Sequence, residues 1–401
     1  MKYVWLIVCI LLLCSTVAAE ELHYAQGLDL RQSIQSGIAI EPITQNYQVN
    51  SAYVDMYLFA QDDSQQEVLS SSFPDTVREG NKLHFTWENP QETDLEVYIS
   101  QDIRLRPTTA LVREKIPFPL DPLPPEVASY VAFTQYIDRS PEIAAVAQTL
   151  AAGEDDLFKL QHKIADYVTS RIEYNLSTIT VEANIPSSQV LAQGYGVCDE
   201  ITNLFLSINR ELGIPARFVS GIAYSESILF DTKWGNHGWA EVYFPGVGWV
   251  PYDVTYEQFG WLDPGHIALS KEVDGGTPAL KAQTIGYGYE FSTLPLEFET
   301  AILNQLPKRD PRVRVSVSPF AEEVSIGSFN AIEVLLENDQ DYYVSEELQV
   351  LPTTNLETLG PSTVRIALAP GEKKNIVFPV QVDDNLDPGF RYTFPIGIRD
   401  T

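Results

Sequence analysis

The chain is 401 residues long, carries a formal net charge of −29, and 44% of its residues are hydrophobic. This length exceeds what one hydrophobic core usually organises, so we expect two or three domains. A protein this acidic would be repelled by nucleic acid and by anionic membrane surfaces, which excludes both as its principal partner.

The first residues predict an export signal. Lys2 is followed by an uncharged run from Tyr3 to Ala19, which ends in small residues suited to cleavage. We therefore predict a signal peptide over residues 1–19 and an extracytoplasmic location, either secreted or at the cell surface. The run is also long enough to remain as an N-terminal anchor, which would then be the only contact with a membrane.

Export has a consequence for the cysteines. Cleavage after residue 19 removes Cys9 and Cys14 and leaves Cys198 without a partner in the chain. A single leftover cysteine in an exported protein favours a reactive thiol.

Residues 20–117 carry strand patterns and predict an N-terminal β domain. β-branched and aromatic residues cluster or alternate between polar turns in four segments: Ile38–Ile43, Tyr53–Phe59, His84–Trp87 and Leu95–Leu105. The segment Pro117–Glu126 is too rich in proline to continue a sheet or a helix, so it marks a boundary.

Helical patterns follow this boundary. Ser140 is placed to cap a helix that has Pro141 at its first position. An apolar stripe from Leu157 to Ile172 predicts a second helix. We expect these helices to form the helical half of a domain that spans residues 118–285.

A third helix is predicted to begin at Cys198. Apolar residues recur at helical spacing from Ile201 to Leu212, Gly213 stands where a helix stop belongs, and Pro215 follows. A thiol at a helix N-terminus feels the positive end of the helix dipole, so we expect the pKa of Cys198 to be lowered.

A β-hairpin is predicted next. The strands His237–Phe244 and Gly248–Asp253 are joined by a turn that contains Pro245 and Gly246. Antiparallel pairing brings the outer ends of the two strands together, so Asp253 can bind one imidazole nitrogen of His237 and leave the other facing Cys198. A thiol, an imidazole and an orienting carboxylate are the groups that acyl transfer requires.

These stretches resemble the transglutaminase-like superfamily. The matching pieces are GYGVCDE around Cys198, GIPARFVSG after it and HGWAEVYFPGVGWVPYDVT from His237. The resemblance implies a papain-like core in which Cys198 is the nucleophile, His237 the base and Asp253 the orienting acid. It departs from the family pattern at Gly238, where alanine is usual.

Further site residues are expected around these three. Gln193 is a candidate for the side-chain donor of an oxyanion hole, because papain-like enzymes use a glutamine shortly before the cysteine. Substrate-cleft candidates are Trp234, Trp239 and Trp249, whose rings are equally compatible with a core. No cofactor and no metal is expected.

Two alternatives lie in the segment Tyr256–Thr277, which has a loop-like pattern. His266 competes with His237 for the role of base, but His237 is preferred because it begins the strand that pairs with the one delivering Asp253. A metal site built from Asp253, Asp263 and His266 is the other alternative, and no paired ligand spacing supports it.

The remainder of the chain predicts a linker and another β domain. Residues 286–310 are expected to be a connector, and residues 311–401 a sandwich that resembles immunoglobulin-like modules, with strict alternation from Arg312 to Ser318. The expected fold class is therefore α+β: a papain-like transglutaminase core flanked by an N-terminal β domain and a C-terminal immunoglobulin-like β-sandwich.

Two functions fit this sequence. The first is an exported cysteine enzyme that attacks an amide bond in a protein or peptide substrate and forms a thioester on Cys198, either as a peptidase or amidase or as a protein-glutamine acyltransferase. The second is a catalytically silent scaffold at the cell surface that binds a peptide.

Overall fold

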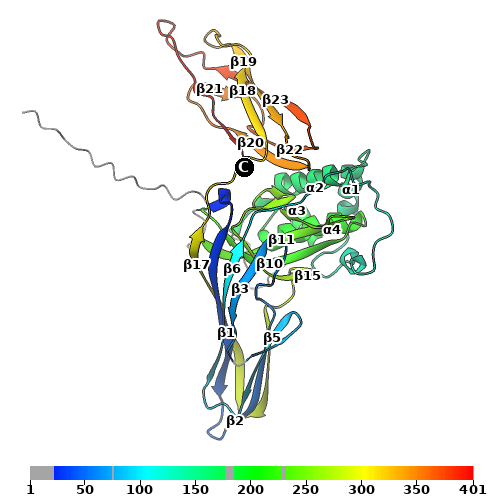
Figure 1. Ribbon diagram of the computed structural model, residues 1–401, viewed down its shortest axis with the longest axis vertical. Helices are drawn as coiled ribbons and strands as arrows, with labels where there is room; N and C mark the ends of the chain where they lie inside the picture. The colour runs from blue at the N-terminus through cyan, green and yellow to red at the C-terminus, as the bar shows by residue number, and fades with distance from the viewer. Residues whose placement is uncertain (1–21, 75, 177–184, 228–231, 401) are drawn as a thin grey trace, which may run out of the picture.

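A computed structural model describes residues 22–74, 76–176, 185–227 and 232–400. The predicted signal peptide, residues 1–19, lies outside this part of the chain. Within the described ranges, the helices are too short or too polar to cross a membrane. The molecule is elongated, with a β unit at each end and a mixed helical and β unit between them (Figure 1).

The N-terminal unit consists of two four-stranded sheets that enclose one apolar cluster. In spatial order, one sheet contains β17 (Tyr289–Gln305), β1 (Leu28–Pro42), β6 (Asp94–Leu105) and β3 (Gln66–Ser72). The other contains β16 (Leu280–Tyr287), β2 (Gln48–Met56), β5 (Lys82–Glu88) and β4 (Thr76–Glu79). The predicted strand content of this region is present, and its strands are longer than their sequence patterns indicated.

The expected linker over residues 286–310 is wrong. The chain returns to the N-terminal unit after the central one, and β17 pairs with β1 along nearly its whole length, from Tyr289 opposite Pro42 to Gln305 opposite Leu28. Likewise β16 pairs with β2. These strands lie at sheet edges with one face exposed, so their polar composition resembles that of a connector.

The central unit has a five-stranded antiparallel sheet. Its spatial order is β13 (Gln258–Phe259), β12 (Gly248–Asp253), β11 (Trp234–Phe244), β10 (Ala216–Tyr224) and β15 (His266–Glu272). Strand β15 lies where the sequence pattern suggested a loop. Its run Ile267–Leu269 is short but fully buried, because β15 completes the sheet beside β10.

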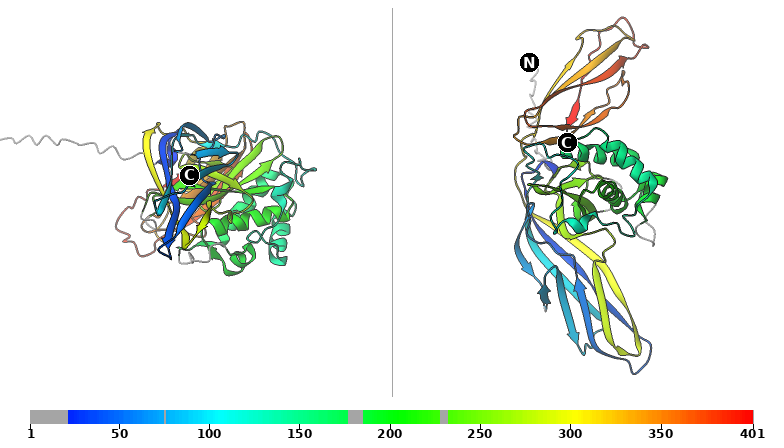
Figure 2. Two further views of the ribbon diagram at one scale, coloured as in Figure 1. Left: turned by 90° about the horizontal axis from the view of Figure 1, so that it is seen from below. Right: turned by 90° about the vertical axis from the view of Figure 1, so that its right-hand side faces the viewer.

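Helices cover one face of this sheet, as the turned view in Figure 2 shows. They are α1 (Pro141–Ala151), α2 (Leu157–Arg171), α3 (Ser187–Gln193) and α4 (Cys198–Glu211). The predicted cap of α1 is present: the Ser140 hydroxyl accepts a hydrogen bond from the backbone N–H of Ile143 at 3.2 Å. Asp156 caps α2 in the same way.

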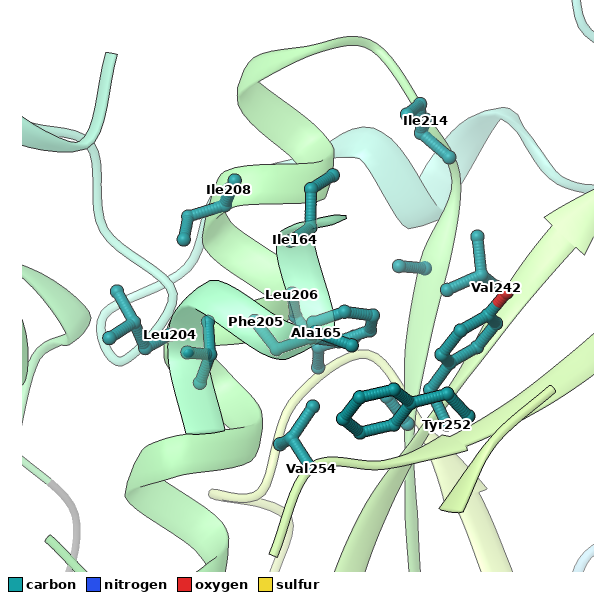
Figure 3. Packing of buried hydrophobic residues seen from close by; sticks show 14 of the residues in the cluster. Ile164, Ala165, Leu204, Phe205, Leu206, Ile208, Ile214, Val242, Tyr252 and Val254 are labelled. Atoms are coloured by element: carbon teal, nitrogen blue, oxygen red, sulfur yellow. The ribbon is translucent and has the colours of Figure 1, made fainter. Parts of the chain in front are cut away.

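Helix α4 is the most deeply buried of these helices. Figure 3 shows Leu204, Phe205 and Ile208 of α4 packed among side chains of α2 and of the β11–β12 hairpin. Burying several large side chains on each face fixes the axis of α4 relative to the sheet. The residue at its N-terminus, Cys198, is therefore held rigidly relative to β11.

The outer units are joined to the central one by burial and by charge. The apolar cluster of the N-terminal unit includes Ile222, Ile267 and Leu269 from the central sheet. On the other side, Tyr343 belongs to the apolar cluster of the central unit and donates its hydroxyl to the Asp156 carboxylate at 2.7 Å. The β units are thus packed against the central unit through shared cores.

The C-terminal unit contains two further antiparallel sheets around their own apolar cluster. One has the order β18 (Arg314–Pro319), β19 (Phe329–Glu337), β23 (Lys373–Val382) and β21 (Leu356–Thr358), and the other β22 (Thr363–Leu368), β20 (Val344–Val350) and β24 (Ile398–Asp400). The alternating pattern of residues 391–398 is typical of a strand, but β24 begins only at Ile398.

We predict that limited proteolysis will cut the proline-rich segment 117–126 well before it cuts residues 289–305. The backbone of β17 is hydrogen-bonded to β1 and resists the extended binding that a protease requires, whereas Pro117–Glu126 has few such bonds. Mass spectrometry of the first fragments locates the cuts. An early cut inside β17 would contradict its place in the sheet.

Candidate active site

The nucleophile candidate stands at the first position of α4. Gly194 adopts a left-handed conformation, φ 78°, that ends α3, and the chain then turns into α4 at Val197. The backbone N–H of Val197 donates to the Glu200 carboxylate at 3.0 Å, which fixes the first turn of the helix. Cys198 is partly exposed, and it is the free cysteine of the described chain.

The hairpin brings the imidazole and the carboxylate together as predicted. In the β11–β12 register, Ala240 lies opposite Tyr252, so the two outer strand ends meet. His237 Nε2 lies 2.5 Å from Asp253 Oδ2. The His237 side chain is 4% exposed and that of Asp253 0%, so this hydrogen bond is largely shielded from water.

The sulfur of Cys198 lies against the strand residue that follows His237. The backbone N–H of Gly238 is close enough to the sulfur to favour the thiolate. The Gly238 carbonyl in turn accepts a hydrogen bond from the Thr202 hydroxyl of α4 at 3.1 Å. Asp253 occupies Nε2 of His237, so the ring nitrogen that is not engaged with Asp253 is Nδ1.

The expected lowering of the thiol pKa is wrong. Withdrawal of the thiol from water raises the pKa of Cys198 well above its usual value, and the neighbouring Asp199 carboxylate adds to the rise. The sulfur lies 3.5 Å from Asp199 Oδ1. The Gly238 N–H lowers the pKa but does not offset the other two effects.

The absence of a Cβ atom at Gly238 leaves room for the Asp199 side chain. A Cβ atom on Gly238 would lie 2.6 Å from Asp199 Oδ1 and 2.3 Å from Phe218 Cζ. The Asp199 side chain thus lies close to the place where the methyl group of the usual alanine would be. The departure from the family pattern at residue 238 therefore has a structural reason.

A pocket of about 480 Å³ opens beside these residues, where all three units meet. Tyr174 and Tyr256 form the wall next to the catalytic candidates: the Tyr256 ring stacks on His237 at a centroid distance of 4.4 Å. Burial raises the pKa of both tyrosines, and so does the charge of a Cys198 thiolate. The other lining residues are His23, Tyr24, Tyr224, Ser225, Glu226, Ser227, Thr255, Gln258, Trp261, Arg309 and Arg399.

The three predicted cleft tryptophans do not line this pocket. Trp239 is 1% exposed and belongs to the core, where it packs behind His237 and His266. Trp249 lies at the far end of the hairpin, under the guanidinium of Arg217. Trp234 packs edge-on against Tyr224, which does line the pocket.

The side chain of Gln193 is engaged elsewhere. Its amide N–H donates to the carbonyl of Tyr195 at 2.8 Å, within the turn between α3 and α4. A role in the oxyanion hole requires this local bond to break. Tyr174, whose hydroxyl stays protonated because its pKa is raised, is a second candidate donor in the pocket wall.

His266 does not replace His237 but shares Asp253 with it. His266 Nε2 lies 3.1 Å from Asp253 Oδ2, and its Nδ1 lies 2.9 Å from Asp263 Oδ1. The nearest donor atoms of His237, Asp253 and His266 lie within 4.8 Å of one another, a spacing that a metal ion could also use. Hydrogen bonds join these three side chains.

Three site residues were missed by the sequence reasoning: Asp199, Tyr174 and Tyr256. Asp199 follows the cysteine directly, so a check of neighbouring charges could have found it. Tyr256 follows Asp253 in a turn whose backbone N–H groups bind the carboxylate. Tyr174 lies in the stretch YVTSRIEYN, which resembles the family only weakly. It stands on β8 (Glu173–Tyr174), a two-residue strand that pairs with β9 (Tyr195–Gly196).

Comparisons with known proteins find relatives of the central unit. Residues 144–254 match the family model of the transglutaminase-like superfamily. The uncharacterized protein YebA of Bacillus subtilis is 30% identical over 159 residues, which cover 36% of this chain and 21% of that protein. An uncharacterized protein of Mycobacterium leprae is 29% identical over 125 residues, which cover 30% and 43%. The matches thus span less than half the length of either relative.

A solved structure shares the fold. A candidate cysteine protease from Cytophaga hutchinsonii superposes with a TM-score of 0.50 at 15% identity, covering 69% of this chain and 91% of that one. The family match of residues 144–254 and the shared fold thus relate the central unit to the core of the transglutaminase-like superfamily.

We predict that Gly238→Ala will destabilise the fold by about 1–3 kcal/mol, the usual cost of overpacking a core. The added methyl group meets Phe218, which is 1% exposed and has no room to move. Urea unfolding measures the change. Gly235→Ala on the same strand is the matched control, because a Cβ there meets nothing within 4 Å; equal losses in both variants would refute the packing argument.

A second prediction concerns the thiol. Asp199→Asn removes a negative charge next to the sulfur, so the thiolate becomes less unfavourable and the pKa of Cys198 falls. The rate of labelling by iodoacetamide should then rise at pH 7, with a midpoint at lower pH than in the unmodified protein. Glu200→Gln on the same helical turn is the control. A midpoint that stays in place, or moves to higher pH, would rule out Asp199 as a cause of the raised pKa.

Proposed function

We propose that the transglutaminase-like core of this chain is a cysteine enzyme that hydrolyses amide bonds in peptides or proteins, with Cys198, His237 and Asp253 as its catalytic residues. The observation that carries the proposal is the bond between His237 Nε2 and Asp253 at 2.5 Å, which leaves Nδ1 for the thiol at the start of α4. An imidazole held in this way has a fixed tautomer and a fixed direction.

The reaction follows from these contacts. His237 Nδ1 takes the thiol proton while the sulfur attacks the substrate carbonyl carbon, and the imidazolium then gives that proton to the leaving amine. A thioester on Cys198 remains. Water, deprotonated by His237, attacks the thioester and releases the carboxylic acid and the thiol. Asp253 stays ionised throughout, since His237 and His266 hold its pKa far below its usual value despite its burial.

The pocket supports a peptide as substrate. Aromatic walls from Tyr174, Tyr224 and Trp261 suit an apolar or aromatic side chain, and polar groups at the rim suit peptide amides. Transfer of the acyl group to an amine, as in a protein-glutamine acyltransferase, uses the same thioester. We favour water as the acceptor because this pocket lies next to the site: it is lined by Tyr256, whose ring stacks on His237.

The proposed setting is outside the cytoplasm. It rests on the signal-like segment over residues 1–19 and on the high negative charge. The free state of Cys198, with no disulfide partner among the described residues, is compatible with export only if the thiol has a use.

A second function is favoured by one observation. The raised pKa of the Cys198 thiol beside Asp199 is what an inert cysteine would show. A catalytically silent protein that binds a peptide in the tyrosine-lined pocket is therefore the alternative proposal.

Activity on a peptide library separates the two proposals. Cleavage should be detectable with the full chain, absent in Cys198→Ala, and at least about 10²-fold lower in His237→Ala, the usual loss of a general base. Gln193→Ala should lower kcat about 10²-fold if its amide turns to the oxyanion, and Tyr174→Phe should do so if that hydroxyl is the donor. If no form cleaves peptides, and Cys198→Ala binds them as well as the unmodified protein does, the silent binding protein is favoured. If a fluorescent amine is incorporated into the substrate, acyl transfer is favoured.

A further inference from the structure

One buried side chain next to the proposed catalytic residues has no role in the reaction above. His266 is 0% exposed, and each of its ring nitrogens lies against a buried carboxylate. Its Nε2 is 3.1 Å from Asp253 Oδ2 and its Nδ1 is 2.9 Å from Asp263 Oδ1. Both carboxylates are themselves completely buried.

The hydrogen bonds fix the protonation of this ring. An ionised carboxylate only accepts hydrogen bonds, so both nitrogens of His266 must carry a proton. His266 is therefore an imidazolium held between two carboxylates. Burial disfavours its charge, but Asp263 and Asp253 outweigh burial and raise the pKa of His266 to about 10.

Asp263 extends the arrangement to the surface. Its Oδ1 also accepts the backbone N–H of Gly265 at 2.7 Å. Its Oδ2 accepts the amide of Gln258 at 2.7 Å and lies 2.6 Å from Nδ1 of His23. His23 is 31% exposed and belongs to a short 3-10 helix, η1 (Leu22–Tyr24), at the start of the N-terminal unit.

Imidazoles and carboxylates thus alternate along one chain of contacts, in the order His237, Asp253, His266, Asp263 and His23. Three different segments supply the imidazoles: β11, β15 and η1. The contact between His23 and Asp263 joins residues 240 positions apart in sequence. Local folding of the central unit does not produce it.

We propose that His266 is a positioning residue that holds the Asp253 carboxylate toward His237, and that His23 completes this support, so that docking of the segment Leu22–Ala25 sets the competence of the site. This inference rests on the proposed function only for the role of His237. The buried cation neutralises one of the two buried carboxylates, which keeps Asp253 ionised and in place without a solvent contact.

Other charged and titratable groups also face this chain. Around His266 they are Asp253, Asp263, His237 and Tyr256, the last at a ring centroid distance of 5.6 Å. Around His23 they are Asp263, His266, Glu226 and Tyr224. Arg309 and Arg399 line the same pocket. Burial opposes a charge on His23, but Asp263 outweighs it and raises its pKa.

Isosteric substitutions separate positioning from mere packing. A glutamine at residue 266 can place its Nε2 where the imidazole Nε2 donates to Asp253, whereas an asparagine can reach only the Asp263 side. His266→Gln keeps the hydrogen bond to Asp253 and loses only the positive charge, so the labelling rate of Cys198 by iodoacetamide should stay within about threefold of the unmodified protein at pH 7. His266→Asn should lower it about tenfold or more, a usual loss when a partner that orients a functional imidazole is removed.

His23 is partly exposed, so its substitutions test the inference even if the variants of the buried His266 fail to fold. His23→Ala should lower the labelling rate about threefold, because Asp263 loses the hydrogen bond from residue 23 and the contacts that orient His237 loosen. His23→Asn restores the rate, since its side-chain amide can occupy the position of Nδ1. His84→Ala is the matched control: His84 is 29% exposed and lies 2.6 Å from Asp55 in the same N-terminal unit, away from the site.

Mass spectrometry of the peptide that contains Cys198 gives the labelling rate without any knowledge of the substrate. Equal rates in His266→Gln and His266→Asn, or equal effects of His23→Ala and His84→Ala, would overturn the inference. Peptide cleavage measured on the same samples tests the proposed function separately. If the His23 and His266 variants change the labelling rate but no form cleaves peptides, the positioning role is supported and the proposed enzyme is refuted. If peptides are cleaved at rates that do not depend on His23 or His266, the enzyme is supported and the positioning role is refuted.

Discussion

The Asp253 carboxylate is the constraint on which the rest of this site depends. It is completely buried, and an unpaired charge in such a place costs about 3–5 kcal/mol. Four donors satisfy it: the backbone N–H groups of Thr255 and Tyr256 at 2.9 and 2.8 Å, and the imidazoles of His237 and His266. The turn after β12, the hairpin and β15 must all be formed before this set is complete.

This requirement explains why the outer units are packed firmly against the centre. Strand β15, which carries His266, contributes Ile267 and Leu269 to the apolar cluster of the N-terminal unit. On the other side, Glu257 holds a left-handed conformation, φ 62°, and pairs with Arg365 of the C-terminal unit at 2.7 Å. Each β unit therefore restrains a segment of the central unit that lies shortly after Asp253 in the chain.

The sequence correctly predicts the features that depend on local residue patterns. Helix α4 and the β11–β12 hairpin follow from spacing within a short window, and so does the pairing of His237 with Asp253. It failed where partners are distant, as with β17, which pairs with β1 across more than 200 residues. Trp239 was misplaced for a simpler reason: alternate residues of a strand share a face, so Trp239 lies on the buried face that also carries His237.

Two opposing effects act on the pKa of the Cys198 thiol: the N-terminus of α4 lowers it, and the charge of Asp199 raises it. A helix N-terminus stabilises a negative charge by about 0.3–1 kcal/mol, whereas a like charge near 4 Å costs about 4 kcal/mol at the dielectric typical of protein sites. Asp199, 3.5 Å from the sulfur, and the loss of water therefore outweigh the helix. A thiol that is not ionised beforehand depends on His237 to take its proton during attack. The orientation of that imidazole, and hence the integrity of the buried carboxylate behind it, then matters more than it would for a preformed thiolate.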